Sequence, residues 1–279
     1  TISNGESATY VLGQSDFTAL AYTTTRNAVL TPRVLFYEYE RSLLYVGNLN
    51  RISVFDVATT SNNEQAAYVL GQSSFTFMEE AVNQANRFAG NVTSISIDPI
   101  RRYLFVGHEN RVSTFDVSTI TNGEAAINII GVSTFTTSSS NISVGTSSIA
   151  GVNGLAYASS TLYAGSVGYN RISLFDVSSI SNGEGAVDLI GQYTDHNTSN
   201  LIVDYSKFGI DNGQPGSFGF NSPNNIALDK VRHRMFVSDV NNRRILVFNL
   251  NNDNTITNFE ADYVLGQSDF ASTTASTTQ

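Results

Sequence analysis

The chain has 279 residues, of which 41% are apolar and 14% are charged, and its formal net charge is −9 with thirteen arginines but only two lysines. Nucleic acids and anionic membranes select proteins with a dense basic face, so this balance excludes both as main partners. No apolar run approaches the length of a membrane span, which excludes membrane insertion, and the lack of cysteine excludes disulfides and thiolate metal sites.

The chain does not begin with methionine and no signal peptide heads it, so we expect a processed or truncated N-terminus. Ser, Thr, Asn and Gly are abundant, whereas Lys is scarce. This composition favours an extracellular or cell-surface location.

Two phrases recur along the chain, which is the signature of a repeat architecture with a period of about sixty residues. The first is RISVFDV at 51–57, RVSTFDV at 111–117, RISLFDV at 171–177 and RILVFNL at 244–250. The second, YVLGQSDF and its variants, occurs five times, at 10–17, 68–75, 127–135, 187–194 and 263–270. The chain therefore begins and ends in mid-repeat.

Each unit contains four short runs rich in β-branched and aromatic residues, and none shows a sustained helical period. Four antiparallel strands form one blade of a β-propeller. We therefore predict an all-β, single-domain β-propeller over 1–279, with four four-stranded repeats (blades) of about sixty residues and one surplus outer strand at the N-terminus. The units are 18–75, 76–135, 136–194 and 195–270, with the surplus strand in 1–17 and a Thr- and Ser-rich tail at 271–279.

Two residue types recur at fixed places in the repeat. One phenylalanine per unit is predicted to lie in the core between blades: Phe55, Phe115, Phe175 and Phe248. One glycine interrupts each copy of the outer strand and predicts a bulge or a close backbone approach: Gly13, Gly71, Gly131, Gly191 and Gly266.

The connection between the second and third strands ends in Asn-Arg at 50–51, 110–111 and 170–171, and in Asn242-Arg243-Arg244 in the fourth unit. Asn tolerates the left-handed conformation that such turns need, and the Arg is expected to reach a carboxylate or carbonyl of an adjacent blade. We interpret this as a structural use of polar residues.

The fourth unit, FNSPNNIALDKVRHRMFVSDVNNRRILVF at 220–248, resembles the NHL repeat, in which a proline opens the inner strand and VxD…NxRIxVF follows. Pro32 stands where Pro223 does. The aspartate of VSD is replaced in the other units by Asn48, His108 and Ser166. The LGQSDF phrase is similar to that of secreted bacterial NHL proteins. NHL propellers commonly close with six blades, so four units imply either a four-bladed ring or an open arc that another chain completes.

The two terminal copies of YVLGQSDF compete for one place, because a strand from one terminus often completes the blade built by the other. If 9–17 takes that place, 263–270 is free to pair with a neighbouring copy, and the exchange can propagate into a fibre. The alternative is that the surplus strand pairs with blades removed by truncation. The predicted interaction residues are Tyr10, Val11, Leu12, Tyr263, Val264 and Leu265.

Three histidines, His108, His196 and His233, lie at non-equivalent places without metal-ligand spacing, so we expect exposed loop histidines rather than a zinc or copper site.

The hairpin at 249–260 gives a weak calcium candidate, because Asn249, Asn251, Asp253 and Glu260 have the ligand spacing of a calcium loop. It lacks the leading Asp and the central Gly of such loops. The alternative is an ordinary Asn-rich turn.

The longest insertion, 193–221, is the best candidate for a recognition loop, and Asp204, Tyr205 and Lys207 are its candidate contact residues. A solvated spacer or a subunit contact is the alternative. Three triplets match the N-glycosylation rule, at Asn91, Asn141 and Asn197.

These features favour a non-enzymatic, extracellular or cell-surface propeller with a structural or adhesive role and no cofactor. We expect it to self-assemble into a homo-oligomer or filament through its terminal strands, or to bind other surface proteins or glycans. Two alternatives are a ligand-binding NHL-type module that uses the 193–221 loop and a metal-dependent propeller enzyme of lyase or lactonase type.

Overall fold

The computed structural model describes residues 4–20, 22–76, 84–88, 90–138, 144–191 and 215–275. The chain forms two compact units. One contains Thr1–Val92 and Thr119–Ala125, and the other contains Thr93–Ser118 and Ala126–Gln279. The single-domain organisation stays a prediction.

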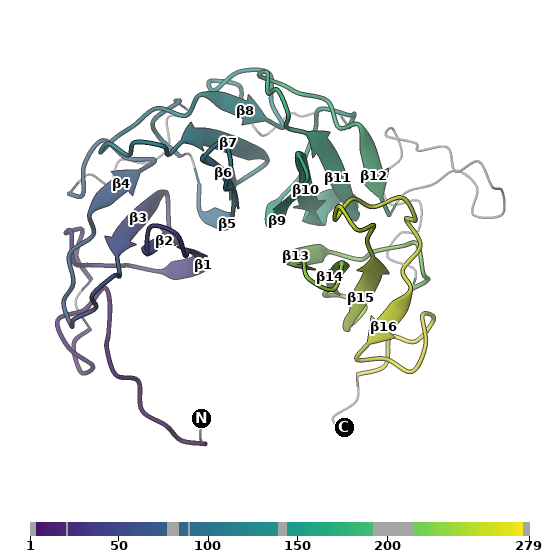
Figure 1. Cartoon of the computed structure of the whole chain (residues 1–279), viewed down its shortest axis with the longest axis horizontal. Coiled ribbons are helices and arrows are strands. Elements are labelled where there is room, and N and C mark those ends of the chain that lie inside the picture. Colours follow the sequence, from purple (N-terminus) through teal and green to yellow (C-terminus); the bar gives the residue numbers. More distant parts are fainter. Residues whose placement is uncertain are drawn as a thin grey trace. The chain divides into compact units, whose positions relative to one another are not determined.

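The described residues form four antiparallel sheets of four strands, and the strands of each sheet follow chain order (Figure 1). This confirms the prediction of an all-β propeller with four blades. The first sheet contains β1 (Pro32–Glu38), β2 (Leu43–Asn48), β3 (Arg51–Asp56) and β4 (Tyr68–Leu70). The second contains β5 (Val92–Asp98), β6 (Tyr103–His108), β7 (Arg111–Asp116) and β8 (Asn128–Ile130).

The third and fourth sheets lie in the second unit, as do β6, β7 and β8 of the second sheet. The third sheet contains β9 (Val152–Ala158), β10 (Thr161–Ser166), β11 (Arg171–Asp176) and β12 (Asp188–Ile190). The fourth contains β13 (Pro223–Asp229), β14 (Arg234–Asp239), β15 (Arg244–Asn249) and β16 (Tyr263–Leu265). The one described helix is the short 3-10 turn η2 (Val167–Tyr169). None of the described residues form a helix that is long and apolar enough to cross a membrane.

The strands form where β-branched and aromatic residues alternate, because such side chains pack well on a pleated surface. Each outer strand is shorter than its phrase and has three residues. The four predicted core phenylalanines are fully buried, and each contributes about 1.5–3 kcal/mol relative to an exposed side chain. The two prolines predicted to open inner strands, Pro32 and Pro223, are the first residues of β1 and β13.

In the four outer phrases that form strands, the glycine follows the last residue of the strand instead of lying inside it. Gly71 follows β4 with a φ of 80°, and a Cβ there would lie 2.2 Å from the ring of Phe88. Gly191 follows β12, and a Cβ there would lie 2.7 Å from the Phe220 ring. The predicted close approach is therefore confirmed, and the positive φ explains why the residue is glycine.

In the second unit, two apolar clusters fill the spaces between successive sheets. Phe105 and Ile130 of the second sheet pack with Leu155, Tyr157 and other residues of the third. Tyr163 and Ile172 of the third sheet pack with Met235, Leu246 and other residues of the fourth. The third sheet thus has one face that packs on the second sheet and an opposite face that packs on the fourth. In every sheet we call the face that corresponds to the first of these the docking face and the opposite one the receiving face.

The turns before the third strands differ from the prediction. The left-handed residue is Asn170 only in the third sheet, whereas it is Leu49, Glu109 and Arg243 in the others. In these three turns the Asn follows or precedes the left-handed position by one residue. Each turn therefore contains a left-handed residue, but that residue is the predicted Asn only in the third sheet.

Candidate interaction site

The N-terminal phrase takes the place of an outer strand on the docking face of the first sheet. Val11 N donates to Asn62 Oδ1 at 2.9 Å, as Val69 N of β4 donates to Asn122 Oδ1 at 2.9 Å. Leu12 packs on the cluster of Val46, Phe55 and Val69 in the first sheet. Ile130 of β8 packs in the same way on the third sheet. The segment therefore makes the side-chain contacts of an outer strand on the docking face of the first sheet.

Residues 10–17 do not form the predicted β-ladder, however. Each of the other outer strands pairs with the third strand of its own sheet, and 10–12 has no such neighbour among the described residues. Without that ladder the backbone lacks the hydrogen bonds that define a strand. The surplus segment thus lies where an outer strand would lie, but it lacks the backbone pairing of a strand.

The C-terminal copy of the phrase does form a strand. In β16, Tyr263, Val264 and Leu265 pair with Val247, Leu246 and Ile245 of β15. Leu265 is 48% exposed, whereas the equivalent Ile130 and Ile190 are fully buried beneath the next sheet. The receiving face of the fourth sheet is therefore uncovered at its outer strand.

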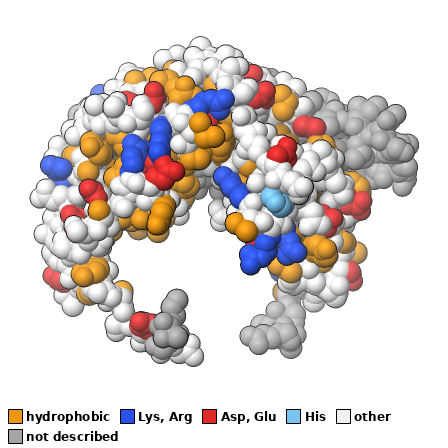
Figure 2. Space-filling model, viewed as in Figure 1, with side chains coloured by type: hydrophobic (Ala, Val, Ile, Leu, Met, Phe, Trp, Pro, Cys, Tyr) orange, Lys and Arg blue, Asp and Glu red, His pale blue; other side chains and the backbone are white. Residues whose placement is uncertain are grey.

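The receiving face of the fourth sheet is also exposed at its third and first strands, β15 and β13. Ile245 of β15 is 39% exposed, although the equivalent Ile172 is fully buried. Ala227 of β13 is exposed, whereas its equivalent Ala156 is buried. Figure 2 shows basic side chains on this part of the second unit, where Arg232 and Arg234 are exposed.

The docking face of the first sheet is uncovered at its inner strand. Leu35 and Tyr37 of β1 are 63% and 48% exposed, whereas the equivalent Leu155 and Tyr157 of β9 are 6% and 7% exposed. The N-terminal segment covers only the outer part of this face. The first and fourth sheets therefore expose apolar residues at positions where the third sheet buries them, which makes these two faces candidates for association.

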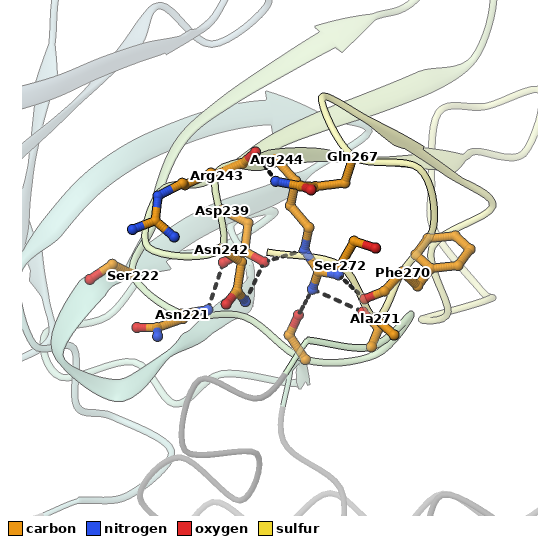
Figure 3. A network of polar contacts seen from close by, with 12 residues as sticks. Asn221, Ser222, Asp239, Asn242, Arg243, Arg244, Gln267, Phe270, Ala271 and Ser272 are labelled. Carbon is orange, nitrogen blue, oxygen red and sulfur yellow. Dashed lines mark hydrogen bonds and ion pairs between the residues drawn. The ribbon is translucent and has the colours of Figure 1, made fainter. Parts of the chain in front are cut away.

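A buried polar network fixes one end of the fourth sheet (Figure 3). Arg244 Nε donates to Asp239 Oδ2 at 2.7 Å, and both side chains are fully buried. The Arg244 guanidinium also donates to the carbonyls of Phe270, Gly216 and Gly219 at 2.5–3.0 Å. The network connects β15 to the segments that precede and follow the fourth sheet in the sequence.

The other sheets use the same arginine with a different neighbour. The last residue of the second strand pairs in register with this arginine in every sheet. The neighbours are Asn48 with Arg51, His108 with Arg111, Ser166 with Arg171 and Asp239 with Arg244. Arg51, Arg111 and Arg171 also donate to backbone carbonyls of flanking links, at Phe75, Phe135 and Ser148. The predicted carbonyl contacts therefore form, but these acceptors belong to the arginine's own repeat unit and not to an adjacent blade.

The expectation of exposed histidines is wrong for His108. It ends β6, is buried, and its Nε2 lies 2.8 Å from Ser113 Oγ. Burial and the nearby Arg111 lower the pKa of His108 to about 3, so the side chain is neutral at physiological pH. His233 is half-buried, with Nδ1 2.9 Å from Asn254 Oδ1, and His196 lies outside the described residues.

The calcium candidate forms a compact turn. Asp253 Oδ1 accepts hydrogen bonds from Thr255, and Asn251 Nδ2 donates to Thr255 Oγ1 at 2.9 Å. Glu260 Oε1 instead accepts from Ser217 at 2.7 Å, and Asn249 is exposed. Within the described ranges, no group of three or more His, Asp or Glu side chains has the geometry to hold a metal ion.

Several predicted site residues lie outside the described residues. These are Asp204, Tyr205 and Lys207 of the recognition loop and the glycosylation candidates Asn141 and Asn197. Asn91 is described and exposed. The predicted terminal residues are described: Tyr10, Tyr263 and Leu265 are exposed, and Val11, Leu12 and Val264 are half-buried.

No protein-family model matches the chain, and no curated protein matches it in sequence. Among solved structures, the chain is similar to the β-propeller domain of Cps50 (Swd1) from Myceliophteria thermophila, with a TM-score of 0.46 and 12% identity. The similarity covers 80% of this chain and 66% of that propeller-domain chain. At this level the similarity carries no information on function.

Proposed function

We propose that the chain is a non-enzymatic structural β-propeller at an extracellular or cell-surface location, and that it assembles with copies of itself by exchanging terminal outer strands. One observation carries this proposal. The segment 10–17 has the contacts of an outer strand on the first sheet, through Val11 and Leu12, but pairs with no third strand in the part of the chain that the structure describes.

The third strand β15 of another copy supplies that partner. Leu12, Val11 and Tyr10 would pair with Ile245, Leu246 and Val247 in the register that Leu265, Val264 and Tyr263 now hold. Because the two phrases are identical at YVLGQSDF, the exchanged ladder has the same backbone and side-chain contacts. Such a contact is heterologous, so it makes a ring if the rotation closes and a filament if it does not.

Deletions of the two phrases test the proposal. We expect the full chain, the chain without 1–17 and the chain without 263–279 to associate, because each keeps one copy of the phrase for the shared place. The chain without both segments should be monomeric by light scattering and show no filaments in negative-stain electron microscopy. Circular dichroism checks that it stays folded. A monomeric full chain, or equal association without both segments, contradicts the proposal.

A further inference from the structure

A tyrosine joins the third sheet to the second. The ring of Tyr157 in β9 stacks on Phe105 of β6, with 6.0 Å between centroids and 23° between planes. Its hydroxyl donates a hydrogen bond to Asp98, the last residue of β5. The receiving face of the second sheet thus offers an aromatic ring and a carboxylate, and the docking face of the third sheet inserts a tyrosine.

The fourth sheet carries the same receiving pair. Phe236 has the register position of Phe105, since Phe236 pairs with Val247 as Phe105 pairs with Thr114. Asp229 ends β13 as Asp98 ends β5, and each carboxylate accepts from two backbone amides and one arginine of the next turn. Asp98 is fully buried, whereas the Asp229 side chain is 26% exposed.

The first sheet carries the matching tyrosine. Tyr37 pairs with Leu44 as Tyr157 pairs with Leu162, so the two tyrosines hold the same position on their docking faces. Leu35 lies two residues before Tyr37, and its equivalent Leu155 is buried in the cluster between the second and third sheets.

The contact between the third and fourth sheets uses a different pair of residues. There the carboxylate position holds Ala158, and the docking position holds Leu228, which packs in the same apolar cluster. The tyrosine thus lies opposite the aspartate of the second sheet, whereas a leucine lies opposite the alanine of the third. Asp229 corresponds to Asp98, and Tyr37, which is 48% exposed, corresponds to Tyr157.

We propose that the docking face of one copy, with Leu35 and Tyr37, packs on the receiving face of a second copy, with Asp229, Phe236 and Ile245. The ring of Tyr37 stacks on Phe236 of the second copy and its hydroxyl donates to Asp229. This inference rests on the proposed self-association and names the surface through which it occurs. It adds contacts of the inner strands to the exchange of the terminal phrases, so variants of Tyr37 or Asp229 test it while leaving both phrases intact.

Cysteine cross-linking tests which copies meet, because the chain contains no native cysteine. One variant carries Leu35→Cys and another carries Ala227→Cys, both at exposed positions. We expect a short bismaleimide to give a covalent dimer only when the two variants are mixed. Val187→Cys, exposed on the third sheet, is the matched control and should not cross-link to Leu35→Cys. In the double variant, a cross-link confined to one chain would show that the two faces meet within a single copy and would overturn the proposal.

A double-mutant cycle tests the tyrosine contact itself. Tyr37→Phe and Asp229→Asn should each raise the dissociation constant about tenfold or more, and the double variant should raise it little further, since both remove one hydrogen bond to a charged group. Tyr22→Phe, at an exposed tyrosine, is the control and should have no effect. If the wild type associates but neither variant changes the constant and no cross-link forms, this inference fails and the proposed function stands. If the wild type does not associate, both fail.

Discussion

The second and fourth sheets are built alike but meet different surroundings. Both offer an aromatic ring and an aspartate on the receiving face, but the second sheet is covered by Tyr157 of the third and the fourth is uncovered. They also differ at the last residue of the second strand. The fourth sheet has Asp239 there, in a buried ion pair with Arg244, whereas the second sheet has neutral His108. The second sheet is thus covered on its receiving face, whereas the fourth is uncovered there and carries a buried ion pair within the sheet.

The ion pair of the fourth sheet should give the largest effect. Asp239→Ala leaves the buried Arg244 guanidinium without a counter-charge, and we expect the free energy of unfolding to fall by about 3–5 kcal/mol. Asp239→Asn should cost less, because Asn48 holds the same place beside Arg51 in the first sheet. Urea unfolding measures both. Equal losses for the two variants would show that hydrogen bonding geometry, not charge, sets the cost.

The next largest effect should be the difference in unfolding free energy between substitutions at a covered and at an uncovered leucine. Leu155→Ala removes a buried side chain between two sheets, and we expect it to lower the free energy of unfolding by about 2–5 kcal/mol. Leu35→Ala, at the equivalent exposed position, should change it by about 0.5 kcal/mol or less under dilute conditions. Thermal or urea unfolding at low protein concentration makes the comparison. A large loss for Leu35→Ala in a monomer would mean that this face is already covered.

The two equivalent tyrosines, Tyr157 and Tyr37, allow the covered and uncovered faces to be compared through a single hydroxyl group. Burial works to raise the pKa of Asp98, but hydrogen bonds from Arg101, Ile100 and Tyr157 outweigh it and lower the pKa below its ordinary value. Tyr157→Phe removes one of these bonds and should cost about 1.5–3 kcal/mol. Tyr37→Phe should leave the stability of the monomer unchanged and weaken association only. Equal effects of both substitutions on dilute-solution stability would remove the distinction.

The histidine gives the smallest and most pH-dependent effect. The folded pKa of His108 is about 3, below its ordinary value of 6.5, so between these pH values the unfolded chain binds a proton that the folded chain does not. Stability should therefore fall as the pH drops through 6.5 toward 3, by about 1.4 kcal/mol at pH 5.5 from this residue. His108→Gln should flatten this part of the stability profile. An unchanged profile would show that His108 does not govern it.

The sequence was sufficient for the four strands of each sheet, the core phenylalanines and the close approach at the outer-phrase glycines, because each repeats at one place in a unit whose period is readable. It failed for His108, although the signal was present: His108 aligns with Asn48, Ser166 and Asp239 at the end of the second strand. It also predicted a strand at 10–17, since a phrase cannot reveal that its ladder partner is missing. Which of Leu35 and Leu155 is covered depends on the neighbouring sheet and not on local sequence.

Variants in which one of the two faces is blocked by a charge test the head-to-tail contact between copies most directly. Leu35→Glu places a charge on the docking face, and Ala227→Glu places one on the receiving face. Sedimentation velocity should find each variant monomeric on its own, and an equal mixture should form a dimer that grows no further, because one intact face of each kind remains. A mixture that stays monomeric, or assembly of either variant alone, would contradict the head-to-tail contact between terminal sheets.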